Sequence, residues 1–195
     1  DMTRSRGLGD VYKRQKRPRP VELPDAMLTT DPAAVVNDPA VDVLVEVIGG
    51  IEPARSLILQ AIAAGKSVVT ANKAVIARHG TEIAAAAKAA GVYVLIEAAV
   101  GGGIPIIEPL KQSLGANRID RVSGIINGTT NYILTRMAEE GAAYEAVLAD
   151  AQRLGYAEAD PAADVDGLDA ADKIAILSTL ACLLYTSPSP RDLVI

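Results

Sequence analysis

The stretch "VDVLVEVIGG" (residues 41–50) is a run of apolar side chains that ends in two glycines. A continuous apolar run of this length predicts a strand that is buried on both faces. Helical spacing follows in "EPARSLILQAIAAG" (52–65), with Pro53 in the first turn and Gly65 just past the end. A second short strand, "KSVVT" (66–70), comes next, so strand and helix alternate from this point.

The alternation continues for one more round. The segment "HGTEIAAAAKAAG" (79–91) predicts an alanine-rich helix, and "VYVLIEAAV" (92–100) predicts another buried strand, which "GGGIP" then breaks. The order β-α-β-α-β over residues 41–104 implies a parallel sheet with right-handed crossovers. This part of the chain is therefore predicted to be α/β.

The second half of the chain has a different pattern. The segment "IIEPLKQSLG" (106–115) has helical spacing, whereas "RIDRVSGIING" (118–128) alternates and predicts a strand. Two helices follow, with Gly141 and Gly155 as their C-terminal stops, and a loop then leads into a helix from about Leu168. These elements are typical of the start of an α+β domain.

Composition and charge exclude several classes of protein. The chain has 195 residues and a net charge of −5, which argues against nucleic-acid binding. Its single Cys182 and single His79 leave no disulfide framework and no Cys-rich or His-rich metal centre. No apolar run approaches the roughly 20 residues of a membrane helix. We therefore expect a cytoplasmic protein, and we expect the unpatterned termini, residues 1–15 and 183–195, to be non-native.

Ligands of parallel α/β sheets bind beyond the carboxyl ends of the strands. Gly49 and Gly50 lie at that edge, where they either let a ligand approach the backbone or form a simple tight turn. Lys73 of "TANK" (70–73) is either a ligand contact or a surface lysine. The glycines at 101–103 match neither the P-loop nor the dinucleotide pattern, but they suit a turn whose carbonyls face a small cation.

The acidic stretch "GYAEADPAADVDGLDAADK" (155–173) contains six carboxylates and one lysine. A calcium loop of the EF-hand type needs acids at its first and twelfth positions, where this stretch has Ala162 and Lys173. Asp169 and Lys173 are spaced i, i+4, so they share one helix face beside an apolar stripe. A half-buried site and a solvated acidic face both remain open at this point.

Five strings together resemble homoserine dehydrogenase, and the resemblance spans about residues 20–182. They are "VDVLVEVIGG", "TANK", "EAAVGGGIPII", "SGIINGTTNYIL" and "GYAEADPAADVDGLDAADK", in that order. The resemblance implies an oxidoreductase that uses NADP or NAD to interconvert L-homoserine and L-aspartate 4-semialdehyde, in threonine, methionine and isoleucine biosynthesis. It also implies a Rossmann-type sheet, a substrate and dimerisation domain, and a homodimeric or homotetrameric parent.

The resemblance also assigns roles to single residues. Lys173 would be the catalytic lysine, and Lys73 would lie near both cofactor and substrate. From their place at the strand edge, Gly49 and Gly50 are expected to contact the cofactor as well. The implied substrate-binding residues are Glu158, Asp164, Asp169, Gly128 and Thr129. The implied sodium site uses backbone oxygens of Glu97, Val100, Gly102 and Ile104.

One departure from the family pattern is the missing Gly-rich βαβ unit that opens its nucleotide-binding domain. We therefore expect an internal fragment, with residues 16–104 from the nucleotide-binding domain and residues 105–182 from a truncated substrate domain. Such a fragment is expected not to turn over by itself. Two other interpretations are another Rossmann-type amino-acid dehydrogenase and a non-catalytic acidic module that binds a cation.

Overall fold

The computed structural model describes residues 29–181, and the predictions for residues 1–15 and 183–195 and for Cys182 lie outside that range. The chain divides into two compact units, with the break between Ile104 and Pro105.

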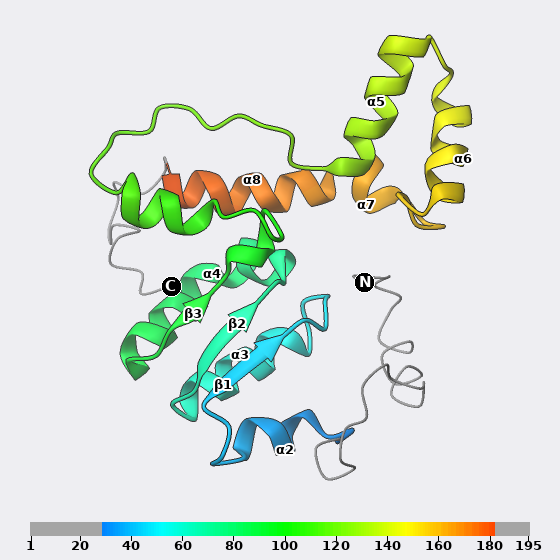
Figure 1. Cartoon of the computed structure of the whole chain (residues 1–195). Coiled ribbons are helices and arrows are strands. Elements are labelled where there is room, and N and C mark those ends of the chain that lie inside the picture. The colour runs from blue at the N-terminus through cyan, green and yellow to red at the C-terminus, as the bar shows by residue number, and fades with distance from the viewer. Residues whose placement is uncertain (1–28, 182–195) are drawn as a thin grey trace. The chain divides into compact units, whose positions relative to one another are not determined.

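The first unit contains a three-stranded parallel sheet in the order β1-β2-β3 (Figure 1). Its elements are α2 (Pro32–Asn37), β1 (Val43–Glu46), α3 (Ala54–Ala63), β2 (Ser67–Thr70), α4 (Lys73–Ala90) and β3 (Val94–Leu95). Val43 pairs with Ser67, and Val68 pairs with Val94. Each helix returns the chain to the start of the next strand, which confirms the predicted β-α-β-α-β order and the α/β class.

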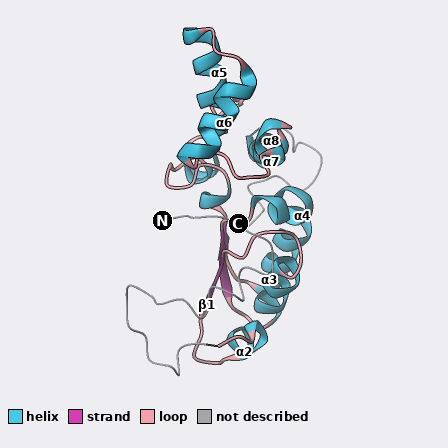
Figure 2. Cartoon of the chain, turned by 90° about the vertical axis from the view of Figure 1, so that its right-hand side faces the viewer, coloured by secondary structure: helices cyan, strands magenta, loops and turns pink. Residues whose placement is uncertain are grey.

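In the described part of the first unit, the helices α3 and α4 cover one face of the sheet, as Figure 2 shows. Successive side chains of a strand point to opposite faces, so only alternate residues reach these helices. Val68 of β2 is fully buried with Ile58 of α3, whereas Val43 and Val45 of β1 are 48% and 63% exposed. The prediction of a strand buried on both faces was therefore wrong for β1. An apolar run predicts that a strand can be buried, but it does not predict which other elements cover each face of that strand.

Two element boundaries in this unit differ from the prediction. The helix predicted from residue 79 begins at Lys73, because the Asn72 side chain accepts a hydrogen bond from Val75 N (3.2 Å) and so caps the helix earlier. The strand predicted over residues 92–100 is limited to β3, and the short 3₁₀ helix η2 (Glu97–Ala99) follows it. Lys73 is therefore a helix residue at the carboxyl edge of the sheet, and not part of a loop.

The second unit is helical over its described part. It contains the π-helix η3 (Pro109–Ser113), α5 (Gly128–Glu140), α6 (Tyr144–Leu154), α7 (Ala162–Val165) and α8 (Leu168–Ala181). Gly141 and Gly155 end α5 and α6 with positive φ angles, as predicted. The strand predicted at 118–128 was wrong, because residues 118–127 have no hydrogen-bonded strand beside them in the described part of the unit, and Gly128 already belongs to α5.

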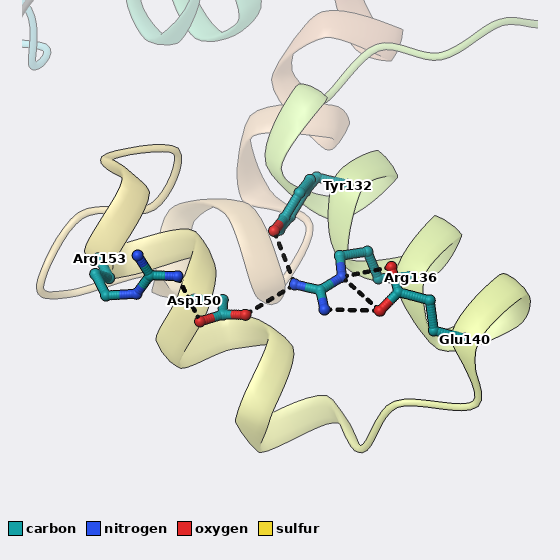
Figure 3. Close-up of polar contacts among 5 residues, drawn as sticks. All are labelled: Tyr132, Arg136, Glu140, Asp150 and Arg153. Carbon is teal, nitrogen blue, oxygen red and sulfur yellow. Dashed lines mark hydrogen bonds and ion pairs between the residues drawn. The ribbon is translucent and has the colours of Figure 1, made fainter.

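A small core and a polar cluster join α5 to α6. Ile133, Val147, Ala151 and Ala157 form the core. In Figure 3 the Arg136 guanidinium donates to Asp150 Oδ2 (2.8 Å), Glu140 Oε2 (2.7 Å) and the Tyr132 hydroxyl (3.1 Å). Hydrogen bonds from Arg136 hold the carboxyl pKa values of Glu140 and Asp150 below their ordinary values.

The buried side of the first unit predicts a clear difference in stability between two truncations. Ile58→Ala removes a fully buried side chain and should lower the free energy of unfolding by about 2–5 kcal/mol. Val45→Ala, on the open face of the sheet, should change it by about 0.5 kcal/mol or less. Urea denaturation followed by circular dichroism measures both, and equal losses would contradict the assignment of the buried face.

The Arg136 cluster predicts a pH-dependent contribution to stability. The pKa values of Glu140 and Asp150 lie below the ordinary 4.5 and 3.8, so their stabilising effect is complete above those values. It is lost as the pH falls through the lower folded-state pKa values. Arg136→Met should therefore lower the melting temperature at neutral pH, and the difference from the unmodified chain should shrink in acid. The exposed Arg121→Met is the control, and a difference that persists unchanged in acid would count against the cluster.

Candidate functional site

A buried carboxylate ties together the carboxyl ends of β1 and β2. Glu46 is 2% exposed, and it accepts hydrogen bonds from Thr70 Oγ1 (2.6 Å) and from the backbone N of Ile48 (2.8 Å). Both contacts come from the edge at which ligands of parallel sheets bind. Sequence analysis missed Glu46, although an acid inside an otherwise apolar strand was the available signal.

Asn72 holds the glycine turn that follows β1. Its Nδ2 donates to Gly50 O (2.7 Å), and its backbone N donates to Thr70 Oγ1 (2.9 Å). Gly49 and Gly50 have φ angles of +83° and +73°, a region that residues with a side chain rarely adopt. A Cβ added to Gly49 would meet no atom within 4 Å, so its surroundings are open. The two glycines do form a tight turn, and their contact with a ligand stays a prediction.

The loop predicted to hold a cation is a tight turn after η2. Ile104 N donates to Gly101 O (3.0 Å), and Gly102 has a φ of +60°. A Cβ on Gly101 would lie 2.4 Å from Ile104 O, so this position has no room for a side chain. The loop therefore depends on glycine at two successive positions. Ion binding by the carbonyls of Glu97, Val100, Gly102 and Ile104 stays a prediction.

In the second unit, the acidic stretch forms a half-buried ion pair. Lys173 Nζ lies 2.9 Å from Asp169 Oδ2 on the same face of α8, and it donates to Ile126 O (2.7 Å). The two side chains are 18% and 8% exposed, so most of the lysine and nearly all of the aspartate are removed from water. The predicted shared helix face and partial burial of the pair are confirmed, and the solvated acidic face is wrong for this pair. The role of the pair in a functional site stays a prediction.

Asn127 extends this pair into a network. Its Nδ2 donates to Asp164 Oδ1 (2.8 Å) and to Asp169 Oδ2 (2.9 Å). Its Oδ1 accepts from Thr130 N (2.8 Å) and so caps α5. Sequence analysis did not single out Asn127, because an Asn before a helix predicts a cap and nothing more.

The loop that carries Glu158 is attached to its surroundings through backbone groups. Thr129 Oγ1, on the first turn of α5 beside Gly128, donates to Tyr156 O (2.8 Å). Gln152 Nε2 donates to Glu158 O (3.1 Å). The structure thus brings Asp164, Asp169 and Lys173 together, and it holds the loop of Glu158 to α5 and α6 through backbone oxygens. The role of Glu158 in substrate binding stays a prediction.

Residues 29–181 contain no group of three or more His, Cys, Asp and Glu side chains that could hold a metal ion. Within the same range, no helix is long and apolar enough to cross a membrane. The interpretation as an acidic cation-binding module therefore gains no support from side-chain geometry.

A parallel α/β unit with a glycine turn and a lysine at its carboxyl edge is of the Rossmann type. The family model of the homoserine dehydrogenase NAD-binding domain matches residues 5–97, and the homoserine dehydrogenase model matches residues 105–191. The chain therefore belongs to the homoserine dehydrogenase family. The resemblance seen in the sequence is confirmed.

Individual relatives agree with the family models. Homoserine dehydrogenase of Synechocystis sp. is 70% identical over 164 residues, which are 84% of this chain and 38% of the relative. The Bacillus subtilis homoserine dehydrogenase is 50% identical over 170 residues, 87% of this chain and 39% of the relative. The chain thus spans less than half the length of these curated relatives.

Solved structures show the same similarity. A homoserine dehydrogenase crystal structure from Thiobacillus denitrificans has a TM-score of 0.76 and 61% identity, and the match covers 77% of this chain and 35% of that one. A hyperthermophilic archaeal homoserine dehydrogenase in complex with NADPH has a TM-score of 0.74 and 34% identity, with coverage of 79% and 48%.

Proposed function

We propose that this chain supplies part of the nucleotide-binding edge and the lysine–carboxylate pocket of a homoserine dehydrogenase. The reaction is the NAD(P)-dependent interconversion of L-homoserine and L-aspartate 4-semialdehyde. The observation that carries the proposal is the Lys173 ammonium held between Asp169 and the carbonyl of Ile126, in a chain of this family. In this proposal residues 16–104 serve the cofactor and residues 105–182 serve the substrate.

Lys173 can serve as the proton donor in this reaction. An ammonium group has three N–H donors, and the contacts with Asp169 and Ile126 O use two of them. The third is available for the C4 oxygen of the semialdehyde, where negative charge develops as the aldehyde carbon is reduced. In the opposite direction, the neutral amine takes the proton from the C4 hydroxyl.

The carboxylates would recognise the amino group of the substrate. Asp164 and Asp169 both accept a hydrogen bond from the same Asn127 amide, so two carboxylates converge on one place. An α-ammonium group is the part of homoserine that such acceptors suit. Glu158 would add a third carboxylate from its loop, and Gly128 and Thr129 would line the same pocket.

The residues at the sheet edge fit a nicotinamide cofactor. Gly49 and Gly50 leave the backbone accessible beyond β1, and the positive φ angles exclude bulky replacements. Lys73 places a positive charge at the same edge, suited to an anionic or carbonyl group. When bound, the cofactor, NADP or NAD, supplies the hydride in one direction and accepts it in the other.

The parent enzyme would act in the cytoplasm as a homodimer or homotetramer. The single cysteine of the chain fits a reducing compartment, where no disulfide framework is needed. Its partners would be small molecules, and the acidic net charge of −5 disfavours nucleic acid.

A chimera tests the proposed function directly. The 164 aligned residues of the Synechocystis relative are replaced by those of this chain, which is 70% identical there. We expect the purified chimera to oxidise NADPH when L-aspartate 4-semialdehyde is added. A folded chimera without turnover would contradict the proposal, since these residues would then be unable to form the pocket.

In this chimera, Lys173→Ala should lower kcat by about 10²–10⁴-fold, the usual scale for loss of a general acid–base group. The KM for the semialdehyde should change less, because carboxylates hold the substrate ammonium. Asp169→Ala should lower kcat and raise KM together, since Asp169 contacts the lysine and would contact the substrate. Stopped-flow and steady-state assays separate these effects, with the exposed Lys88→Ala as control. Near-normal kcat in a folded Lys173→Ala chimera would refute the assigned role.

The cation loop gives a separate prediction. Carbonyl oxygens at residues 97–104 should bind a monovalent cation, because the turn is rich in glycine and poor in side-chain ligands. Crystals of the chimera soaked in rubidium should show an anomalous peak within this loop. Gly101→Ala should abolish the peak, because its Cβ would displace Ile104 O, which lies 2.4 Å away. An empty loop at saturating rubidium would refute the site.

A further inference from the structure

We propose that Asn127 is a positioning residue that sets the spacing of the Asp164 and Asp169 carboxylates and holds the latter against Lys173. The inference rests on the proposed function of this pocket and goes beyond it, because Asn127 itself need not touch the substrate. Asn127 is a buried residue, at 8% exposed, and it caps the N-terminus of α5. Asp164 belongs to α7 and Asp169 belongs to α8.

The amide of Asn127 uses all of its hydrogen-bonding capacity. Its two N–H donors go to Asp164 Oδ1 and Asp169 Oδ2, at 2.8 and 2.9 Å. Its oxygen accepts from Thr130 N at 2.8 Å and from Thr130 Oγ1 at 2.9 Å. A side-chain amide offers two donors and two acceptor positions, so its orientation is fixed at both ends.

Residues 126 and 127 together hold both members of the ion pair. Ile126 O accepts from Lys173 Nζ, and Asn127 Nδ2 donates to the same Asp169 oxygen that faces Lys173. A shift of this short segment would therefore move the lysine and the carboxylate together. The two N–H groups also lie between two like charges, which would otherwise repel each other.

Two substitutions separate the capping role from the donor role. Asn127→Asp keeps the shape and the oxygen that caps α5, but it has no N–H to donate and adds a third carboxylate. Asn127→Ser also keeps a capping oxygen, since Ser, Asp and Asn cap helices about equally well, but it is too short to reach the aspartates and adds no charge.

In the chimera, both variants should lower the kcat/KM of the folded protein by about 10²-fold, as misplaced catalytic groups do. Asn127→Asp should also lower the melting temperature, because it leaves three carboxylates side by side without the N–H groups that separate two of them. The charged groups that face residue 127 are Asp164 from α7 and Asp169 and Lys173 from α8; from α5, Thr130 contributes only neutral groups. Asn127→Asp should regain part of the loss as the pH falls, because a protonated carboxyl can donate one hydrogen bond. Asn127→Ser should show no such recovery.

The result that would overturn the inference is a purely structural effect. Both variants would then melt at lower temperature, while their folded fractions keep normal kcat and KM and an unchanged pH profile. Inactivity of the unmodified chimera is a different outcome, since it contradicts the proposed function rather than the positioning role.

A measurement on the 195-residue chain itself tests the geometry without any activity. The side-chain amide signals of Asn127 in ¹⁵N NMR spectra are assigned by their loss in Asn127→Asp. We expect slow hydrogen exchange at both N–H groups, and faster exchange at one of them in Asp164→Ala. Exchange as fast as in a solvated asparagine would overturn the inference whatever the chimera does.

Discussion

The second unit is organised by the need to pair a largely buried ammonium group. Lys173 keeps only 18% of its side chain exposed, and a charge taken out of water must find oppositely charged or hydrogen-bonding partners. Asp169, one turn earlier in α8, is the oppositely charged partner. The carbonyl oxygen of Ile126, in the segment before α5, is the hydrogen-bonding partner. Because residue 126 is far from α8 in sequence, this contact holds the segment just before α5 against α8.

The first unit buries the carboxyl group of Glu46 and satisfies it with neutral donors. Glu46 receives the hydroxyl of Thr70 and a backbone N–H, and Asn72 then links the end of β2 to the turn at Gly50. Parallel pairing makes this possible, because it places the carboxyl ends of β1 and β2 side by side. In both units a buried polar group therefore lies where an element begins or ends, Glu46 at the end of β1 and Asn127 just before α5.

Features set by local spacing could be predicted from the sequence, and features set by distant neighbours could not. The β-α-β-α-β order follows from apolar runs and glycine stops, and the Asp169–Lys173 pair follows from i, i+4 geometry. The strand predicted at 118–128 was wrong. The alternation of apolar and polar residues is a property of that segment alone, whereas a strand also needs a second strand for its backbone hydrogen bonds. Asn127 was missed because a contact across 42 residues has no spacing rule.

Helix capping explains why the Asn127 amide points toward the carboxylates. Its oxygen must face the first turn of α5 to accept from Thr130, so its N–H groups must point away from that turn. Asp169 lies in the first turn of α8, where the helix dipole favours negative charge, and Asp164 lies in the single turn of α7. The two N–H groups of Asn127 thus meet one carboxylate from α7 and one from α8, so a single capping residue connects three helices. The side chain of Lys173 is the cation that the chain itself places against Asp169, from one turn further along α8.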